Sequence, residues 1–280
     1  MRNLYKEQLV PIVLTAVTFF GLWLLLYWFL TILNLFPAKE HILLHLHLPD
    51  ILVGLIIYLK TSVDFGIFIG NLMRSNPGWK KRIAIELGTA IGNGLGTLVV
   101  LTIWNFFREV PLLMAIMILL ASLVLLKMAQ ESLEEFCKAE SDMLEVLNKP
   151  IGTLNAILER INKLFSPLLN ILVPHVGLTR IKTMPWMQLM FFAFSIPFIL
   201  GLDDFAGYIP LFSIINVYGF AVGVFLGHMI LNIALFLSPK KTVQFVQKPL
   251  VLLFGGLAFV GIAIWGFYEV IHLLETIFHF

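Results

Sequence analysis

The chain has 280 residues, of which 59% are hydrophobic and only 13% carry a charge. Soluble globular proteins carry roughly 25% charged residues, so this chain has about half the charge needed to cover itself in water. We therefore predict an all-α integral membrane protein, and the composition excludes disordered, collagen-like and disulfide-rich chains. The lone Cys137 can form neither an internal disulfide nor a multi-thiolate metal site. A formal net charge of +2 gives no reason to expect a nucleic-acid partner.

Apolar stretches long enough to cross about 30 Å of hydrocarbon predict where the chain spans the membrane. The first such stretch is too long for a signal-peptide core and lacks a small-residue cleavage site, so we expect it to remain as a helix. We predict seven transmembrane helices, near residues 9–35, 48–70, 83–105, 111–128, 186–208, 211–237 and 249–274.

The distribution of basic residues predicts the orientation of these spans. If the seven stretches alternate across the membrane, 16 of the 19 Lys and Arg residues fall on one side. The positive-inside rule then predicts a multi-pass protein of the cell (inner) membrane, with its N-terminus in the cytoplasm and its C-terminus outside. Membrane lipid is accordingly its main surrounding partner.

Residues 129–183 form a polar linker on the cytoplasmic side, for which we predict amphipathic helices. Leu154, Ile157, Leu158 and Ile161 recur at spacings of three and four residues, which is typical of a helix lying on a membrane surface or on its own bundle. One interpretation is a connector that packs against the core. The alternative is a segment that binds a regulatory partner.

The two halves of the chain resemble each other at an offset of 139 residues. At this offset Asp64 coincides with Asp203, and Asn93 coincides with Asn232. Each half has three predicted spans, and the linker returns to the side from which it left, so the second half must enter the membrane in the opposite direction. We therefore predict an N-terminal helix and outer loop (1–47), a first three-helix repeat (48–128), the linker (129–183) and an inverted second repeat (184–280). The N-terminal helix lies outside the repeat and is expected to be peripheral.

Ionisable groups within the spans are the main candidates for a functional site, because each costs about 2.5 to 3.5 kcal/mol to insert. Asp64 and Asp203 occupy equivalent places, and two facing carboxylates at a repeat interface could hold a cation or exchange protons. We therefore expect these two aspartates to be metal ligands. On the third span Glu86, Thr89, Asn93 and Thr97 form a polar stripe at helical spacing.

Other polar residues join this candidate site with less specific roles. Lys60 lies one helical turn before Asp64, so the two could form a buried ion pair with no substrate involved. Asp203 could instead be an interfacial acid, and His228 could be a hydrogen-bonded packing residue. The predicted ion-binding set is Asp64, Asp203, Asp204, Asn93, Asn232, Lys60 and Glu86, with His228 and Thr61 as secondary candidates.

The residues from Asp203 to Phe212, DDFAGYIPLF, closely resemble the second acidic signature of the bacterial cadmium resistance transporter family, which is related to the lysine-exporter superfamily. Thr61 and Asp64 are similar to the Thr-x-x-Asp of its first signature. The resemblance implies a cation exporter with Asp64 and Asp203 as its membrane acids, and Asp204 stands where the family often has Asn. Because the predicted spans contain no Cys, the residues themselves suit a harder divalent ion at least as well as Cd²⁺.

We therefore expect a secondary active exporter of a divalent, heavy-metal cation, without an enzymatic activity or a cofactor. No phosphate-binding loop of the ATPase type occurs in the sequence, so the expected driving force is an ion gradient. Two alternative functions remain: export of a small cationic metabolite such as a basic amino acid, and the role of a membrane scaffold that transports nothing. The chain could assemble as a homodimer.

Overall fold

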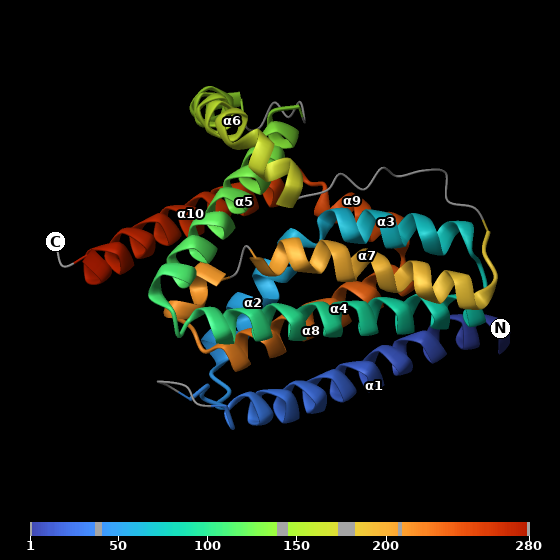
Figure 1. The fold of residues 1–280 in the computed structure, drawn as a ribbon. Coiled ribbons are helices and arrows are strands. Elements are labelled where there is room, and N and C mark those ends of the chain that lie inside the picture. The colour runs from blue at the N-terminus through green and yellow to red at the C-terminus, as the bar shows by residue number, and fades with distance from the viewer. Residues whose placement is uncertain (1, 37–40, 139–144, 173–182, 207–208, 279–280) are drawn as a thin grey trace. The chain divides into compact units, whose positions relative to one another are not determined.

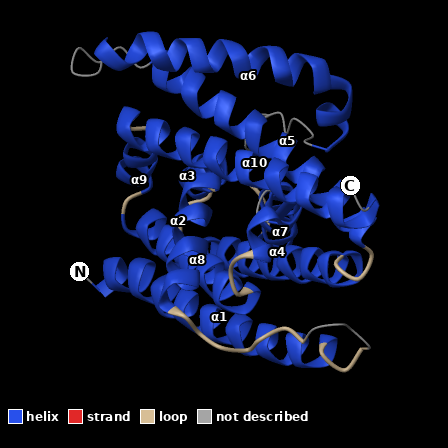
Figure 2. Cartoon of the chain, turned by 90° about the vertical axis from the view of Figure 1, so that its left-hand side faces the viewer, coloured by secondary structure: helices blue, strands red, loops and turns tan. Residues whose placement is uncertain are grey.

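The computed structural model describes residues 2–36, 41–138, 145–172, 183–206 and 209–278. Within these ranges every regular element is a helix, and none is a strand (Figure 2). The backbones of 63–64 and 199–206 are helical, but their side chains lie outside the described part. The helices in chain order (Figure 1) are α1 (Arg2–Leu33), α2 (Leu48–Thr61), α3 (Val63–Ser75), α4 (Trp79–Phe107), α5 (Pro111–Lys138), α6 (Glu145–Leu172), α7 (Trp186–Ala206), the 3₁₀ helix η2 (Ile209–Ser213), α8 (Val217–Leu237), α9 (Pro239–Val246) and α10 (Pro249–Phe278).

Five helices of the described part are long and apolar enough to cross a membrane: α1 from Leu9 onward, α4, α5, α8 and α10. The helices α2 and α3 pass the same test as a pair that is bent by 62°. In α7 the described apolar segment, Trp186–Ser195, is shorter than these helices. The chain is therefore an all-helical, multi-pass membrane protein, as its composition predicts, whereas the number of seven spans remains a prediction.

Local side-chain chemistry explains where several helices begin and end. The Asn216 side chain caps α8 by accepting hydrogen bonds from the backbone N–H groups of Tyr218 and Gly219. Between α3 and α4, Gly78 adopts a φ of +103°, which residues with a Cβ rarely adopt. Asn76 supports the same turn, because its amide donates to the Leu72 carbonyl. These signals fix the start of α8 and the turn between α3 and α4.

The chain forms two compact units that are not continuous in sequence. Unit 1 contains residues 1–105, 177–205 and 214–244, and unit 2 contains residues 106–176, 206–213 and 245–280. Unit 1 thus combines α2, α3 and α4 from the first predicted repeat with α7 and α8 from the second. Unit 2 combines α5 from the first with α10 from the second. Each unit therefore draws helices from both predicted repeats.

Unit 2 is built on an antiparallel pair, α5 and α10, with α6 packed beside α5. The Ser132 hydroxyl of α5 donates to the Leu252 carbonyl of α10 over 2.8 Å. The amide of Asn162 in α6 donates to the Gln130 side chain over 2.7 Å, and Leu158 enters the same hydrophobic core as Leu133. The part of the linker that forms α6 is therefore a connector packed against its own bundle. A regulatory role for this segment stays a prediction.

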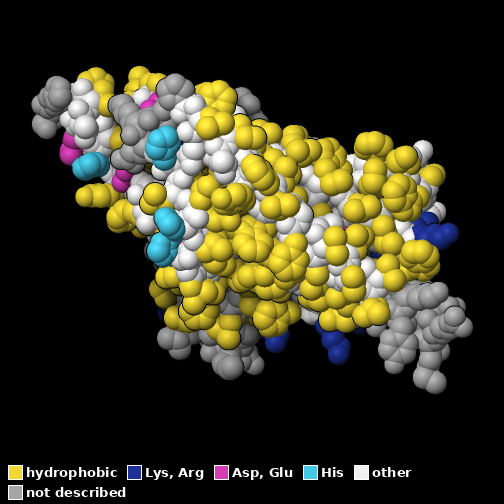
Figure 3. All heavy atoms as spheres, turned by 90° about the horizontal axis from the view of Figure 1, so that it is seen from below, with side chains coloured by type: hydrophobic (Ala, Val, Ile, Leu, Met, Phe, Trp, Pro, Cys, Tyr) yellow, Lys and Arg dark blue, Asp and Glu magenta, His cyan; other side chains and the backbone are white. Residues whose placement is uncertain are grey.

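The outer face of α1 in unit 1 is apolar and exposed, as Figure 3 shows from below. Its residues recur at spacings of three and four, so they share one side of the helix. A continuous apolar face of this size fits contact with lipid chains better than contact with water. The exposed residues on this face are Val13, Val17, Phe20, Leu24 and Trp28.

Candidate functional site

Two helix pairs of unit 1 approach each other closely through glycine. Along α4, Gly88 and Gly92 face the backbone of α7, where an added Cβ on Gly88 would overlap the Met190 carbonyl and one on Gly92 would overlap the Phe194 carbonyl. Along α8, Gly223 faces α2, where an added Cβ would overlap the Ile51 carbonyl. Small residues of this kind let two helix backbones pack directly against each other. These glycines therefore serve the close packing of α4 on α7 and of α8 on α2.

These two pairs have related geometry. In both, contacts advance in the same direction along the two helices, so α4 runs parallel to α7 and α8 runs parallel to α2. Gly88 contacts Phe194, which the 139-residue offset makes the equivalent of Leu55. Leu55 in turn contacts Gly227, the equivalent of Gly88. In each of the two predicted repeats, the glycine-lined helix therefore packs against the first helix of the other repeat.

The polar stripe of α4 points into unit 1. Glu86 and Thr89 are both 0% exposed, and Asn93 and Thr97 are also buried, as their spacing predicts. Glu86 lies near the start of the predicted span 83–105, but its carboxylate is enclosed by neighbouring helices. This full burial makes Glu86 the best defined ionisable group of the candidate site.

The Glu86 carboxylate is held by neutral hydrogen-bond donors from two other helices. The Thr18 hydroxyl of α1 donates to Oε1 over 2.9 Å, and the Asn232 amide of α8 donates to Oε2 over 2.8 Å. Within the described residues no Lys or Arg forms an ion pair with Glu86. The nearest basic residue on its own helix, Arg82, donates to the Phe236 carbonyl. The helix α1, expected to be peripheral, therefore supplies a direct partner to this acid.

A second ionisable residue, His228, continues the hydrogen-bonded chain. His228 is 2% exposed, and its Nε2 lies 3.0 Å from the Asn232 amide nitrogen. Its Nδ1 lies 2.8 Å from the hydroxyl oxygen of Tyr58 in α2. Because the Asn232 amide donates, Nε2 accepts, so the proton of a neutral imidazole lies on Nδ1 and is donated to Tyr58. The chain Glu86–Asn232–His228–Tyr58 thus joins α4, α8 and α2.

Among the buried amide atoms that have no hydrogen-bond partner in the described part of the chain, two belong to predicted ion-binding residues. They are Nδ2 of Asn93 and Oδ1 of Asn232. The two residues are equivalent at the repeat offset, and both are buried. An unused amide oxygen beside a carboxylate can accept from a protonated group or bind a cation. The predicted ion-binding residues Asn93 and Asn232 thus keep free hydrogen-bonding capacity in the interior of unit 1.

The two predicted aspartate ligands lie close to helix ends. The break between α2 and α3 falls at Ser62, two residues before Asp64, and α7 ends at Ala206, three residues after Asp203. The side chains of Asp64, Asp203 and Asp204 lie outside the described part. Their predicted meeting, and the ion pair between Asp64 and Lys60, therefore remain predictions.

The remaining predicted residues lie on α2 beside this break. Thr61 is buried, and its hydroxyl donates to the Tyr58 carbonyl over 3.2 Å. Lys60 is half-buried in the last turn of α2. Sequence reasoning missed Tyr58 and Thr18 as partners of the site. A signal for Tyr58 does exist, because Gly54, Tyr58 and Thr61 share one face of α2 at helical spacing.

Among the residues that the structure describes, no three His, Cys, Asp or Glu side chains lie close enough together to hold a metal ion. A metal site in unit 1 would therefore need backbone or amide oxygens, or the aspartates at 64 and 203, in addition to Glu86. No protein-family model, curated protein or solved structure matches this chain.

Proposed function

We propose that this protein is a secondary active exporter of a divalent cation. The observation that carries the proposal is the Glu86 carboxylate, fully buried in a membrane protein and held by Thr18 and Asn232 rather than by a basic side chain. An ionised group in hydrocarbon costs about 2.5 to 3.5 kcal/mol or more unless its charge is balanced. A carboxylate that has no counter-ion among the described residues is therefore suited to a charge that arrives and leaves, such as a metal cation or a proton.

The helix arrangement within unit 1 supports a transporter over a scaffold. Inverted repeats place their site where discontinuous helices of the two halves meet. In unit 1, α4 packs on α7 and α8 packs on α2, so each glycine-lined interface joins the two predicted repeats. The α2–α3 pair is also discontinuous, with its break at Ser62. Both features agree with alternating access through relative motion of the two repeats.

The directions of the packed helices support the predicted topology. With an N-terminus in the cytoplasm, alternation of seven spans makes α1, α4 and α7 run outward and makes α2 and α8 run inward. The contacts of α4 with α7 and of α8 with α2 are parallel, as this order requires. The hydrogen bond from Ser132 to Leu252 joins the antiparallel α5 and α10, which the same order also requires.

The chemistry of the site favours a hard cation. Carboxylate and amide oxygens are the ligands preferred by hard divalent cations, whereas Cd²⁺ and other soft ions prefer thiolates. In the proposed mechanism Asp64 and Asp203 bind the cation from the two repeats, and Glu86 with Asn232 and Asn93 completes an oxygen-rich lining. Binding and release then accompany exposure of this lining to one side of the membrane at a time.

Uptake by reconstituted vesicles tests the proposal. An exporter that is inserted with its cytoplasmic side facing outward moves its substrate into the vesicle. When an ion gradient is applied, the vesicles should therefore accumulate a divalent ion from a panel that includes Mn²⁺, Zn²⁺, Co²⁺ and Cd²⁺. We expect Asp64→Asn and Asp203→Asn each to abolish uptake while leaving the protein inserted. Glu269→Gln, which removes a carboxylate from α10 in unit 2, is the matched control and should retain uptake.

The same assay separates the alternatives. Competition of metal uptake by a basic amino acid, with transport of that amino acid, would favour export of a cationic metabolite through the same acids. Full activity in the double variant Asp64→Asn/Asp203→Asn would refute the site. Failure of the wild-type protein to move any ion of the panel or any cationic metabolite would leave the scaffold interpretation.

A further inference from the structure

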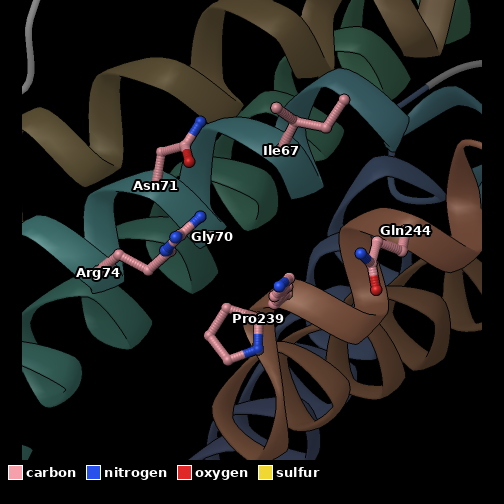
Figure 4. A pocket seen from close by; sticks show the side chains of 7 residues that line it. Ile67, Gly70, Asn71, Arg74, Pro239 and Gln244 are labelled. Atoms are coloured by element: carbon pink, nitrogen blue, oxygen red, sulfur yellow. The ribbon is translucent and has the colours of Figure 1, made fainter.

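A cavity of about 210 Å³ lies in unit 1 between α3 and α9, away from the buried chain around Glu86. Figure 4 shows its two walls, with the residues of α3 on one side and those of α9 on the other. The helix α3 follows the break at Ser62, and α9 follows the end of α8. The lining residues are Ile67, Gly70, Asn71, Arg74, Pro239, Lys240 and Gln244.

The polar lining of this cavity is basic and rich in hydrogen-bond donors. Arg74 comes from α3 and Lys240 from α9, and the described residues that line the cavity include no Asp or Glu. In the described part of the chain, neither of these two cations forms an ion pair. Asn71 and Gln244 add one amide group from each wall. A lining with two positive charges and two amides, and with no acid among its described residues, is suited to an anion.

The position of the cavity indicates that this anion belongs to a lipid. Arg74 lies just beyond the predicted span 48–70, and Lys240 lies just beyond the predicted span 211–237, so both stand where helices leave the hydrocarbon. Leu237, at the end of α8, is 55% exposed and apolar. Ile67 and Pro239 give the cavity apolar surface beside its cations. Basic pockets between transmembrane helices on the cytoplasmic side are suited to anionic lipid headgroups.

We propose that this cavity binds the phosphate group of an anionic phospholipid. The Arg74 guanidinium can donate two parallel hydrogen bonds to phosphate oxygens, and the Lys240 ammonium can approach as a compact charge from the opposite wall. The amides of Asn71 and Gln244 can donate to the remaining oxygens. A bound phosphate would thereby bridge α3 to α9. This proposal does not depend on the transported substrate.

Lipid binding to the purified protein, measured by native mass spectrometry, tests the proposal. The probe is phosphatidylglycerol, compared with phosphatidylcholine of the same acyl chains. We expect one saturable phosphatidylglycerol site on the wild-type protein, with phosphatidylcholine binding at least about tenfold more weakly. Loss of charged hydrogen bonds should weaken phosphatidylglycerol binding about tenfold or more in Arg74→Gln/Lys240→Gln.

A matched variant, Lys80→Gln/Lys241→Gln, removes the same charge from nearby positions that do not line the cavity. It should bind phosphatidylglycerol like the wild-type protein. Equal weakening in the two double variants would overturn the site, because it would indicate nonspecific attraction to a basic surface. Unchanged binding in Arg74→Gln/Lys240→Gln would also overturn it.

A competition experiment distinguishes a lipid phosphate from a free one. Inorganic phosphate at millimolar concentration should displace little of the bound phosphatidylglycerol. Complete displacement would assign the cavity to a soluble anion and overturn the lipid proposal. If the double variant does not fold, the single variant Lys240→Gln and its control Lys241→Gln provide the same comparison on the exposed part of α9.

Discussion

Glycine has different neighbours in the two units, and the difference separates two ways of packing helices. In unit 1, Gly88 and Gly223 face backbone carbonyls of α7 and α2. In unit 2, Gly256 of α10 faces mainly the Leu133 side chain of α5. A side chain can be shortened by mutation, but a backbone carbonyl cannot. The spacing of α4 on α7 and of α8 on α2 is therefore limited by the main chain at these glycines, whereas the spacing of α10 on α5 at Gly256 depends on the side chain that fills it.

The buried polar groups differ in the same way. Unit 1 encloses the hydrogen-bonded chain from Glu86 through Asn232 and His228 to Tyr58, and its members join the three helices α4, α8 and α2. In unit 2 the buried Ser132 of α5 donates to the Leu252 carbonyl of α10, beside a core rich in leucine and phenylalanine. Close backbone packing together with an interior ionisable chain is what a site needs. Apolar packing with few hydrogen bonds between helices is typical of a unit with a structural role.

The largest effect is expected from Gly223→Ala. The added Cβ would overlap the Ile51 carbonyl oxygen and lie 2.9 Å from the Leu55 nitrogen, so α8 and α2 must separate. We expect the free energy of unfolding to fall by at least about 3 kcal/mol, at or above the usual cost of overpacking. Thermal unfolding in detergent, followed by size-exclusion chromatography, measures the change. A variant as stable as wild type would show that this interface can relax.

The next effect is expected from Asn232→Leu in unit 1. The change removes the donor to Glu86 Oε2 and leaves a buried carboxylate short of one hydrogen bond, which costs about 1 to 3 kcal/mol or more for a charged group. Ser132→Ala in unit 2 is the matched comparison, because its Leu252 carbonyl loses only a neutral donor, at about 1 kcal/mol. Denaturation of both variants in one detergent compares their losses in free energy of unfolding. Equal losses would contradict the proposed contrast between the units.

A smaller and reversible effect is expected from Gly256→Ala. Its Cβ would lie 2.7 Å from a terminal carbon of Leu133, at a cost of about 1 to 3 kcal/mol. Shortening that neighbour in Gly256→Ala/Leu133→Ala should make room, so the two changes should be less destabilising together than their sum. A double-mutant cycle of unfolding free energies measures this coupling. In unit 1 no such partner exists for Gly223→Ala among its contacts, which are all backbone atoms.

The smallest effect is expected from Gly21→Ala on α1, where no heavy atom lies within 4 Å of the added Cβ. The change adds a methyl group on an open side of the helix and should alter the unfolding free energy by less than about 1 kcal/mol. It is therefore the control for the two glycine substitutions above. A large loss of stability in the same thermal assay would reveal a contact of this face in the assembled protein.

Helical periodicity was sufficient to predict much of the interior of unit 1. The burial of Glu86, Thr89, Asn93 and Thr97 follows from their spacing on one helix. Partners on other helices could not be predicted in this way. Thr18 and Tyr58 bond to Glu86 and His228 across long sequence separations, and a periodic pattern on one helix does not determine which neighbour it meets.

The position of the helix break shows a second limit. The predicted span 48–70 contains Gly66 and Gly70, which loosen helical backbone, but the break between α2 and α3 falls at Ser62. Thr61 beside it bonds to the backbone carbonyl of Tyr58, a local interaction that competes with regular helix geometry. Such competition depends on the surrounding packing, so sequence alone predicts a loosened region and not the residue at which the helix ends.

The central claim is that the buried carboxylate of Glu86 belongs to the path of a transported positive charge. The most direct test compares Glu86→Gln with Glu269→Gln in vesicles loaded for divalent-ion uptake, after both proteins have been shown to be inserted and folded. The amide of Gln keeps the size of the side chain and removes its charge. The account predicts that Glu86→Gln loses at least about tenfold in uptake rate, equivalent to about 1.4 kcal/mol in the barrier, while Glu269→Gln keeps the wild-type rate. Wild-type uptake by a folded Glu86→Gln protein would contradict the account.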